Sequence, residues 1–105
     1  MKPIAVVTTV ARKKDARALA RALVEAGLAA CAQISPIESL YTWKGKIEHG
    51  REYRVLFKTV DESYGAVESA IRDMHPYDLP AIHAFAFEHI LPAYGDWIAA
   101  HSDGG

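Results

Sequence analysis

The side chains best suited to chemistry in this chain belong to one cysteine and five histidines. Cys31 lies between two alanines in an apolar stretch, where it is either a soft metal ligand or thiol nucleophile, or a small buried hydrophobic residue. We favour burial, because the sequence places neither a base nor a helix start beside it to activate the thiol. The histidines form no H-x-x-x-H pair and the chain has no C-x-x-C pair, so spacing alone indicates no zinc site. The histidines are His49, His75, His83, His89 and His101.

His75 is the most informative of these histidines. It follows the predicted second helix, where the helix dipole favours an imidazolium, and it opens a loop that Pro76 and Pro80 make rigid. We interpret His75 either as a metal ligand or as a cap for the carbonyls at the end of that helix, with equal weight. His83 shares a strand face with Phe85, so we expect it to be packed rather than functional.

Charged and aromatic residues of a predicted hairpin supply the other candidates. Glu52 and Lys58 point the same way on a regular strand. This spacing predicts either cross-strand ion pairing or a Lys58 that holds an anionic ligand or a carboxylate across a subunit boundary. Tyr41 and Trp43 lie near the hairpin tip, and we interpret them as packing anchors between subunits rather than as a stacking platform.

Alternating strands and helices must position these residues. A β-branched run predicts a central strand, and apolar residues at helical spacing predict a first helix that Asp15 caps and Gly27 ends. Asp61 or Ser63 is expected to cap the second helix, whose apolar stripe reaches Met74. The expected elements are strands at 4–10, 29–43, 47–59 and 81–88, helices after Asp15 and after Ser63, a third helix opened by Pro92, and a frayed tail at 102–105.

The order β-α-β-β-α-β predicts an α+β fold of the ferredoxin-like type: an antiparallel sheet, two helices on one face and a C-terminal helix. The length predicts one domain over residues 1–105. The two middle strands are longer than the helices can cover. Their hairpin, turning at 44–46, is therefore expected to project with Tyr41, Trp43 and Ile47 exposed, which favours association.

Composition and charge exclude several classes of protein. The formal net charge is −1, so no positive field gathers nucleic acid or an anionic membrane. No apolar stretch approaches the roughly 20 residues of a membrane span. A single cysteine favours a reducing compartment, so we expect a cytoplasmic protein.

Two functions known on the same topology are disfavoured. An acylphosphatase-like enzyme needs a glycine-rich phosphate loop with an arginine after the first strand, and the segment 8–14 has basic residues but no glycine. An RNA-recognition module needs an aromatic K/R-G-F/Y-G/A-F-V-x-F/Y pattern, which is absent. The residues therefore favour a binding protein rather than an enzyme.

Several spaced motifs resemble one known family. They are A-A-C-A-Q-I at Ala29–Ile34, S-L-Y-T-W-K-G-K-I-E at Ser39–Glu48, E with L-F-K-T at Glu52–Thr59, H-P-Y-D-L-P at His75–Pro80 and Y-x-x-W at Tyr94–Trp97. Their order, and an extent from Ile4 to about Ile98, make the chain resemble the CutA divalent-cation tolerance proteins.

The resemblance implies a ferredoxin-like homotrimer joined through its long hairpins, with an architecture similar to that of the PII signal-transduction proteins. It implies a role in tolerance of copper and other divalent ions, and no firmly attached reaction. Its implied trimer-packing residues are Tyr41, Trp43 and Trp97. Its implied site is an inter-subunit cleft with Thr8, Glu52, Lys58 and Tyr77, His75 as the metal candidate and Cys31 as a weaker one.

Four positions depart from the family pattern. Thr8 and Met74 stand where some members carry a cysteine and a histidine, and Ala81 stands where members commonly carry a glutamate. Arg51 stands where the family residue is often acidic. A Cu²⁺ site of imidazole, thiolate and carboxylate would need replacement ligands here. The expected partners are other copies of the chain and a divalent metal ion or a small anion. The alternative is a PII-like signalling or small-anion-binding module without metal.

Overall fold

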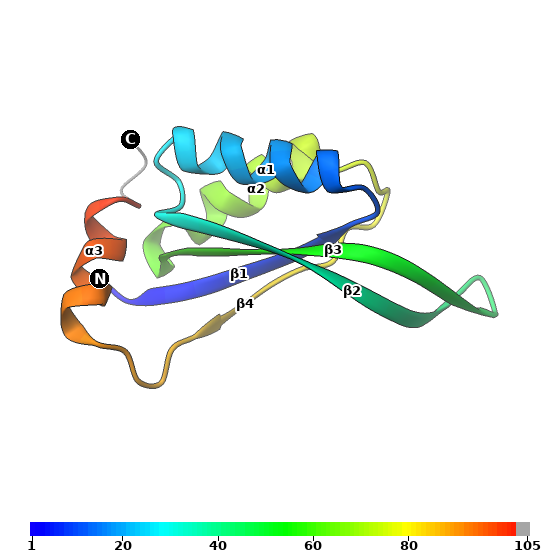
Figure 1. Cartoon of the computed structure of the whole chain (residues 1–105). Coiled ribbons are helices and arrows are strands. Elements are labelled where there is room, and N and C mark those ends of the chain that lie inside the picture. Colours follow the sequence, from blue (N-terminus) through cyan, green and yellow to red (C-terminus); the bar gives the residue numbers. More distant parts are fainter. Residues whose placement is uncertain (103–105) are drawn as a thin grey trace.

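A computed structural model describes residues 1–102 as a four-stranded sheet with helices across one face and at one end (Figure 1). The elements are β1 (Pro3–Val10), α1 (Lys13–Glu25), β2 (Cys31–Trp43), β3 (Lys46–Val60), a 3-10 turn (Asp61–Ser63), α2 (Tyr64–Met74), β4 (Ile82–Ala86) and α3 (Pro92–Ala100). The spatial order is β2-β3-β1-β4, and every neighbouring pair is antiparallel. The predicted order of elements and the ferredoxin-like α+β fold are confirmed.

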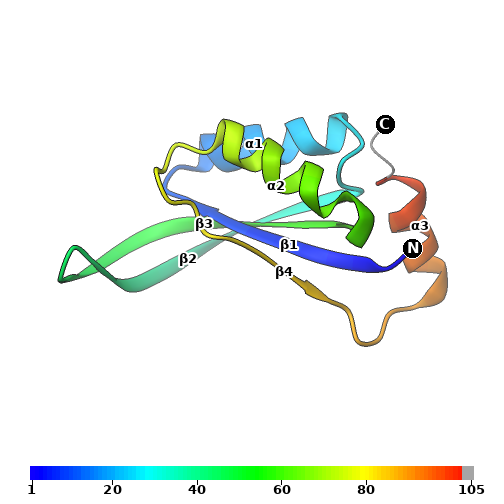
Figure 2. The same ribbon diagram turned by 180° about the vertical axis from the view of Figure 1, so that it is seen from behind.

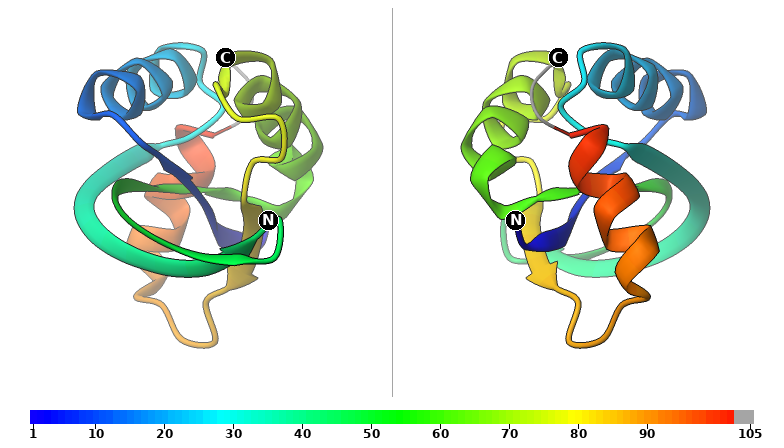
Figure 3. Two further views of the ribbon diagram at one scale, coloured as in Figure 1. Left: turned by 90° about the vertical axis from the view of Figure 1, so that its right-hand side faces the viewer. Right: turned by 90° about the vertical axis from the view of Figure 1, so that its left-hand side faces the viewer.

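The helices and the sheet form two layers. Helices α1 and α2 lie side by side over one face of the sheet, and α3 lies at the end of the sheet near the N-terminus (Figures 1 and 2). Views along the sheet show the strands twisting beneath the two helices (Figure 3). The hairpin of β2 and β3 extends past both helices, so part of the sheet has no helix over it.

The core fills the space between the sheet and these two helices. Even-numbered residues of β1 and odd-numbered residues of β3 point into it, because successive side chains of a strand alternate between faces. Ala5 and Val7, on the other face of β1, are buried too, so the prediction of a central strand buried on both faces is confirmed. The cluster comprises Ile4, Val6, Val10, Ala16, Leu19, Leu23, Ala29, Val55, Phe57, Val67 and Ile71.

The helix starts differ from the sequence predictions. Helix α1 begins before Asp15, which lies in its first turn and favours the helix through the dipole rather than as a cap. Helix α2 has no side-chain cap, because a 3-10 turn precedes it and the Ser63 hydroxyl donates to the Ser102 carbonyl instead. The left-handed end predicted for α1 is confirmed, since Gly27 has a φ of 71°.

The β2–β3 hairpin projects as predicted. Its two-residue turn holds Lys44 and Gly45 at φ values of 51° and 77°, a conformation that matches the twist of the strands. The molecule measures 45 × 26 × 21 Å, and the hairpin arm extends along the long axis (Figure 1). The exposed apolar residues of the arm are Leu40, Tyr41, Trp43 and Ile47, with 69%, 48%, 45% and 75% of their surface accessible.

The second half of the chain departs further from the sequence prediction. Strand β4 is a short edge strand, Ile82–Ala86, rather than the predicted 81–88. His83 and Phe85 point away from the helices and are exposed, so the expected packing of His83 is wrong. Met74 ends α2 and is 44% exposed, so it is not part of the apolar stripe.

The last described residues are tied to the fold. Pro92 opens α3 as predicted. Ser102 is buried rather than frayed, because its carbonyl accepts from Ser63 at 2.8 Å and its hydroxyl donates to the Ile98 carbonyl. The rest of the predicted tail, 103–105, lies outside the described residues. Within residues 1–102, no helix is long and apolar enough to cross a membrane.

Candidate functional site

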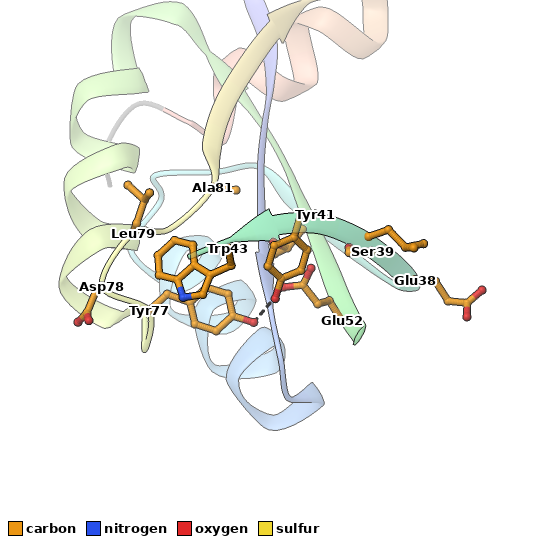
Figure 4. Close-up of a pocket in the computed structure, with 11 residues that line it drawn as sticks. Glu38, Ser39, Tyr41, Trp43, Glu52, Tyr77, Asp78, Leu79 and Ala81 are labelled. Carbon is orange, nitrogen blue, oxygen red and sulfur yellow. Dashed lines mark hydrogen bonds between the residues drawn. The ribbon is translucent and has the colours of Figure 1, made fainter. Parts of the chain in front are cut away.

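A pocket of about 740 Å³ lies between the hairpin arm and the loop that joins α2 to β4 (Figure 4). The arm supplies one wall and residues 77–81 supply the other. Four residues singled out from the sequence meet here: Tyr41, Trp43, Glu52 and Tyr77. The full lining is Thr9, Glu38, Ser39, Leu40, Tyr41, Trp43, Glu52, Tyr77, Asp78, Leu79 and Ala81.

Strand register explains why Glu52 and Tyr77 meet. Strand β1 ends at Val10, opposite Tyr53 of β3, so Glu52 is the first residue of β3 beyond the end of β1. The loop after α2 reaches this point, and the Tyr77 hydroxyl donates to Glu52 Oε2 at 2.9 Å. These two residues, which the resemblance places in a cleft between subunits, are in direct contact within one chain.

This contact keeps Tyr77 protonated. Burial raises the pKa of Tyr77 far above its ordinary value of 10.0, and the hydrogen bond to Glu52 and the charge of that carboxylate raise it further. Tyr77 is therefore a neutral donor throughout the physiological pH range. Glu52 Oε1 makes no hydrogen bond within the described part of the chain, so that oxygen is available to a ligand.

His75 anchors the loop and offers no free ring nitrogen. Its Nδ1 accepts the backbone N–H of Tyr77 at 3.1 Å, and its Nε2 lies 2.8 Å from the Thr9 carbonyl oxygen. A neutral imidazole that accepts at Nδ1 carries its proton on Nε2, which then donates to the carbonyl. The side chain thus joins the loop to β1. This geometry supports neither metal ligation by His75 nor capping of the α2 carbonyls by its ring.

Thr8 lies in the core instead of the cleft. It is fully buried on the even-numbered face of β1, beneath the helices, and its hydroxyl has no hydrogen-bond partner among residues 1–102. Burial therefore contradicts its expected place in the cleft. Thr9, which points to the opposite face, lines the pocket in its place. Successive residues of a strand point to opposite faces, and this alternation was the sequence signal that could have distinguished the buried Thr8 from the pocket-lining Thr9.

Lys58 and Cys31 lie away from the pocket and are paired across β2 and β3. The Lys58 ammonium donates to the Tyr94 hydroxyl at 3.0 Å and lies 5.1 Å from the centre of that ring. Lys58 is about 20 Å along β3 from Glu52, so the two do not share a site within one chain. Cys31 is a free, half-buried thiol.

Helix α3 carries a stack of aromatic side chains. The rings of Tyr94 and Trp97 are nearly parallel, at 7° with centroids 5.8 Å apart, and the His101 ring lies 4.9 Å beyond Trp97. Trp97 is still 42% exposed. Its role in trimer packing stays a prediction.

The residues of one chain do not fit the metal site implied by the resemblance. Across the described residues, no group of three or more His, Cys, Asp or Glu side chains is arranged to hold a metal ion. Both nitrogens of His75 are engaged, and Cys31 is outside the pocket. A Cu²⁺ site of imidazole, thiolate and carboxylate therefore does not form within a single copy.

Sequence reasoning missed several lining residues. Asp78 and Leu79 lie inside the quoted H-P-Y-D-L-P motif, and Ser39 and Leu40 lie inside the quoted hairpin motif. The signal for each segment was therefore present. Which loop faces which strand depends on the tertiary fold, and local spacing does not encode it.

The fold and the pocket together define a ferredoxin-like α+β protein with a projecting hairpin and a ligand-sized cavity beside it. A family profile described as CutA1 divalent ion tolerance protein matches residues 4–101. The divalent-cation tolerance protein CutA of Thermococcus kodakarensis is 34% identical over 99 residues, which cover 94% of this chain and 95% of that protein.

Solved structures give the same result. The CutA structure from Xylella fastidiosa matches with a TM-score of 0.94 at 33% identity, covering 98% of this chain and 100% of that chain. The structure described as the periplasmic divalent cation tolerance protein CutA from Archaeoglobus fulgidus matches with a TM-score of 0.93 at 34% identity, covering 96% and 99%. This chain belongs to the CutA1 divalent ion tolerance protein family.

Proposed function

We propose that this chain is a homotrimeric binding protein that acts in divalent-cation tolerance and assembles through its projecting hairpin. The observation that carries the assembly is the exposed apolar surface of the arm, formed by Leu40, Tyr41, Trp43 and Ile47. By strand register, Leu40 and Ile47 lie on one face of the arm, and Tyr41 and Trp43 lie on the other. Exposed apolar surface marks interaction sites, and aromatic anchors dominate contacts between subunits. The family name supports the tolerance role.

A closed ring is the assembly that suits such an arm. An arm that docks on a different surface of the next copy makes a heterologous contact, which gives a ring when the rotation closes and a filament when it does not. The family resemblance implies three copies. The proposal includes no enzymatic reaction, because the family and the relatives quoted above are named for tolerance of ions.

The assembly is tested by light scattering coupled to size exclusion at micromolar concentration. We expect a trimer for the unmodified chain and a monomer for Ile47→Asp, because a charge then replaces an apolar side chain of the arm. Leu91→Asp is the matched control, since Leu91 is 71% exposed but lies outside the arm. A monomeric unmodified chain, or equal effects of the two substitutions, would contradict assembly through the hairpin.

In this proposal a metal ion binds only between copies of the chain, in the assembled trimer. Because one copy offers no fitting group of ligands within residues 1–102, a Cu²⁺ site has to draw side chains from more than one copy. The half-buried thiol of Cys31 is a soft ligand that such a site could use.

A PII-like or small-anion-binding function without metal is the second candidate. Lys58 favours it, because the partner of its ammonium is the Tyr94 hydroxyl rather than a carboxylate. Calorimetric titration with inorganic phosphate separates the candidates, since phosphate binding that disappears in Lys58→Met would favour the anion function.

We also propose a cytoplasmic location, because the chain has a single cysteine and therefore no internal disulfide. The similar protein from Archaeoglobus fulgidus is described as periplasmic, which differs from the location proposed for this chain. Cell fractionation followed by immunoblotting decides the matter, and recovery outside the cytoplasmic fraction would contradict it.

A further inference from the structure

Positive charge is concentrated on the exposed side of α1 and on the residue before it. Residues 12–21 hold five of the 12 Lys and Arg residues of the chain and only one acidic residue, Asp15. The other seven basic residues are outnumbered by the 12 acidic residues in the rest of the chain. A chain with a formal net charge of −1 therefore carries one strongly positive surface. Its basic residues, all exposed, are Arg12, Lys13, Lys14, Arg17 and Arg21.

Helical spacing gathers three of these side chains into one row. Lys14, Arg17 and Arg21 follow one another at intervals of three and four residues, so they lie along one face of α1 and form its basic ridge. The ridge spans about 10 Å along the helix axis. It points to solvent, because the residues that α1 buries lie on the other side of the helix: Ala16, Leu19 and Leu23. The hairpin arm extends past this helix and does not include the ridge (Figure 1).

The ridge is electrostatically unfavourable in the chain by itself. Like charges one turn apart, such as Arg17 and Arg21, destabilise a helix by about 0.2–0.5 kcal/mol per pair. Basic residues in the first turn, such as Lys14, also oppose the helix dipole, which favours acidic residues there. Arg21 donates to Glu25 at 3.1 Å, but Lys14 and Arg17 make no ion pair within residues 1–102. A bound anionic group would relieve both costs, and folding alone gives no reason for them.

The spacing of the ridge matches that of carboxylates on a peptide. Arg17 and Arg21 are about 6 Å apart along the helix axis. Side chains two residues apart on an extended peptide are separated by about 7 Å and point the same way. Arginine also binds a carboxylate through two parallel hydrogen bonds. An apolar contact is available beside the ridge, since Val24 lies three residues after Arg21 and is 41% exposed.

Nucleic acid and membrane suit the ridge less well. Residues 12–25 contain no aromatic side chain on which a base could stack. Beyond the ridge the chain has an excess of acidic residues, which repels a broad anionic surface such as a bilayer. A short acidic peptide can cover the ridge without meeting that negative charge.

We propose that the basic ridge of α1 binds an acidic segment of a partner protein, whose carboxylates pair with Lys14, Arg17 and Arg21 and which also contacts Val24. The exposed pair between Arg21 and Glu25 costs little to exchange for a partner's carboxylate. The inference goes beyond the function proposed above and is independent of it. The ridge lies within one chain and shares no residue with the arm or with the pocket.

The test is fluorescence anisotropy of a dye-labelled hexaglutamate peptide titrated with the full chain at low ionic strength. We expect saturable binding that weakens as salt is added, and no binding of hexaglutamine. Arg17→Gln should weaken hexaglutamate binding by about twofold to fivefold, the effect of losing one exposed ion pair. Arg72→Gln is the matched control and should leave binding unchanged, because it makes the same change at an exposed arginine of α2, outside the ridge.

Circular dichroism on the same samples checks that α1 is intact. Arg17→Gln should not lower the thermal midpoint, because it removes a repulsion with Arg21. Lys14→Gln repeats the binding test at a second position of the ridge. Equal weakening by the ridge variants and by Arg72→Gln would overturn the proposal, because only the total charge would then matter.

Two other results would also overturn it. The first is no binding of hexaglutamate by the folded, unmodified chain at low ionic strength. The second is binding of a single-stranded oligonucleotide, or of vesicles that contain phosphatidylserine, as tight as that of hexaglutamate. The partner of the ridge would then be a nucleic acid or a membrane rather than an acidic protein segment.

Discussion

Thr8→Val is expected to stabilise the protein. The Thr8 hydroxyl is fully buried and has no partner among the described residues, and leaving such a group unpaired costs about 1–3 kcal/mol. Valine has nearly the same shape and replaces the hydroxyl by a methyl group, so it removes this penalty without opening a cavity. We expect the free energy of unfolding to rise by about 1 kcal/mol.

Thr59→Val supplies a control with the opposite sign. Thr59 is equally buried and lies on the neighbouring strand β3, but its hydroxyl donates to the Leu28 carbonyl at 2.8 Å. The same substitution there removes a satisfied hydrogen bond and leaves the carbonyl unpaired, which should lower the free energy of unfolding by about 1–2 kcal/mol. The two variants should therefore differ by about 2–3 kcal/mol.

The assay is guanidinium denaturation followed by tryptophan fluorescence. All variants are compared at one protein concentration, because the stability of an oligomer depends on it. A shift of the midpoint at an unchanged slope reports stability alone. Equal destabilisation by the two substitutions would refute the reasoning, since it would show that the Thr8 hydroxyl is hydrogen-bonded in solution.

Two further predictions concern the loop over the pocket. Because the folded-state pKa of Tyr77 lies above its unfolded value of 10.0, the stability it contributes is fully present below pH 10.0 and is lost as pH rises through the folded-state pKa. Tyr77→Phe removes the hydrogen bond to Glu52 and should thus lower the free energy of unfolding by about 1 kcal/mol near pH 8. It should also remove the last step of an ultraviolet titration of the tyrosines. An unchanged titration would contradict a raised pKa at Tyr77. Both ring nitrogens of His75 are engaged, so calorimetric Cu²⁺ titrations of the unmodified chain and of His75→Ala should coincide, and loss of saturable binding in the variant would restore His75 as a ligand.

Periodicity made the element order predictable from the sequence. The apolar face of α1, the left-handed Gly27 and the turn after Trp43 each depend on residues close together in the chain, and each lies where it was expected. The prediction that Asp15 caps α1 is wrong by a few residues. The helix starts at Lys13, so Asp15 lies inside its first turn, and the exact start of a helix is not fixed by local sequence alone.

The site was less predictable because its geometry depends on contacts distant in sequence. His75 was weighed as a ligand or as a helix cap, two roles that use nearby atoms, and its ring instead joins Thr9 to Tyr77. Tyr77 in turn reaches Glu52 only because β1 ends one residue earlier in the register. The contacts of His75 with Thr9 and of Tyr77 with Glu52 join residues 66 and 25 positions apart, so neither has a local signature.

The placement of Glu52 and Lys58 limits what a single chain can do. Glu52 is held at the pocket by Tyr77, and Lys58 is held by Tyr94 about 20 Å away along the same strand. The family resemblance implies that both residues lie in one cleft between subunits. A cleft that contains both therefore has to take Glu52 from one copy and Lys58 from another. Glu52→Gln and Lys58→Met chains, mixed after separate purification, should then regain in part any ligand binding that neither variant shows alone.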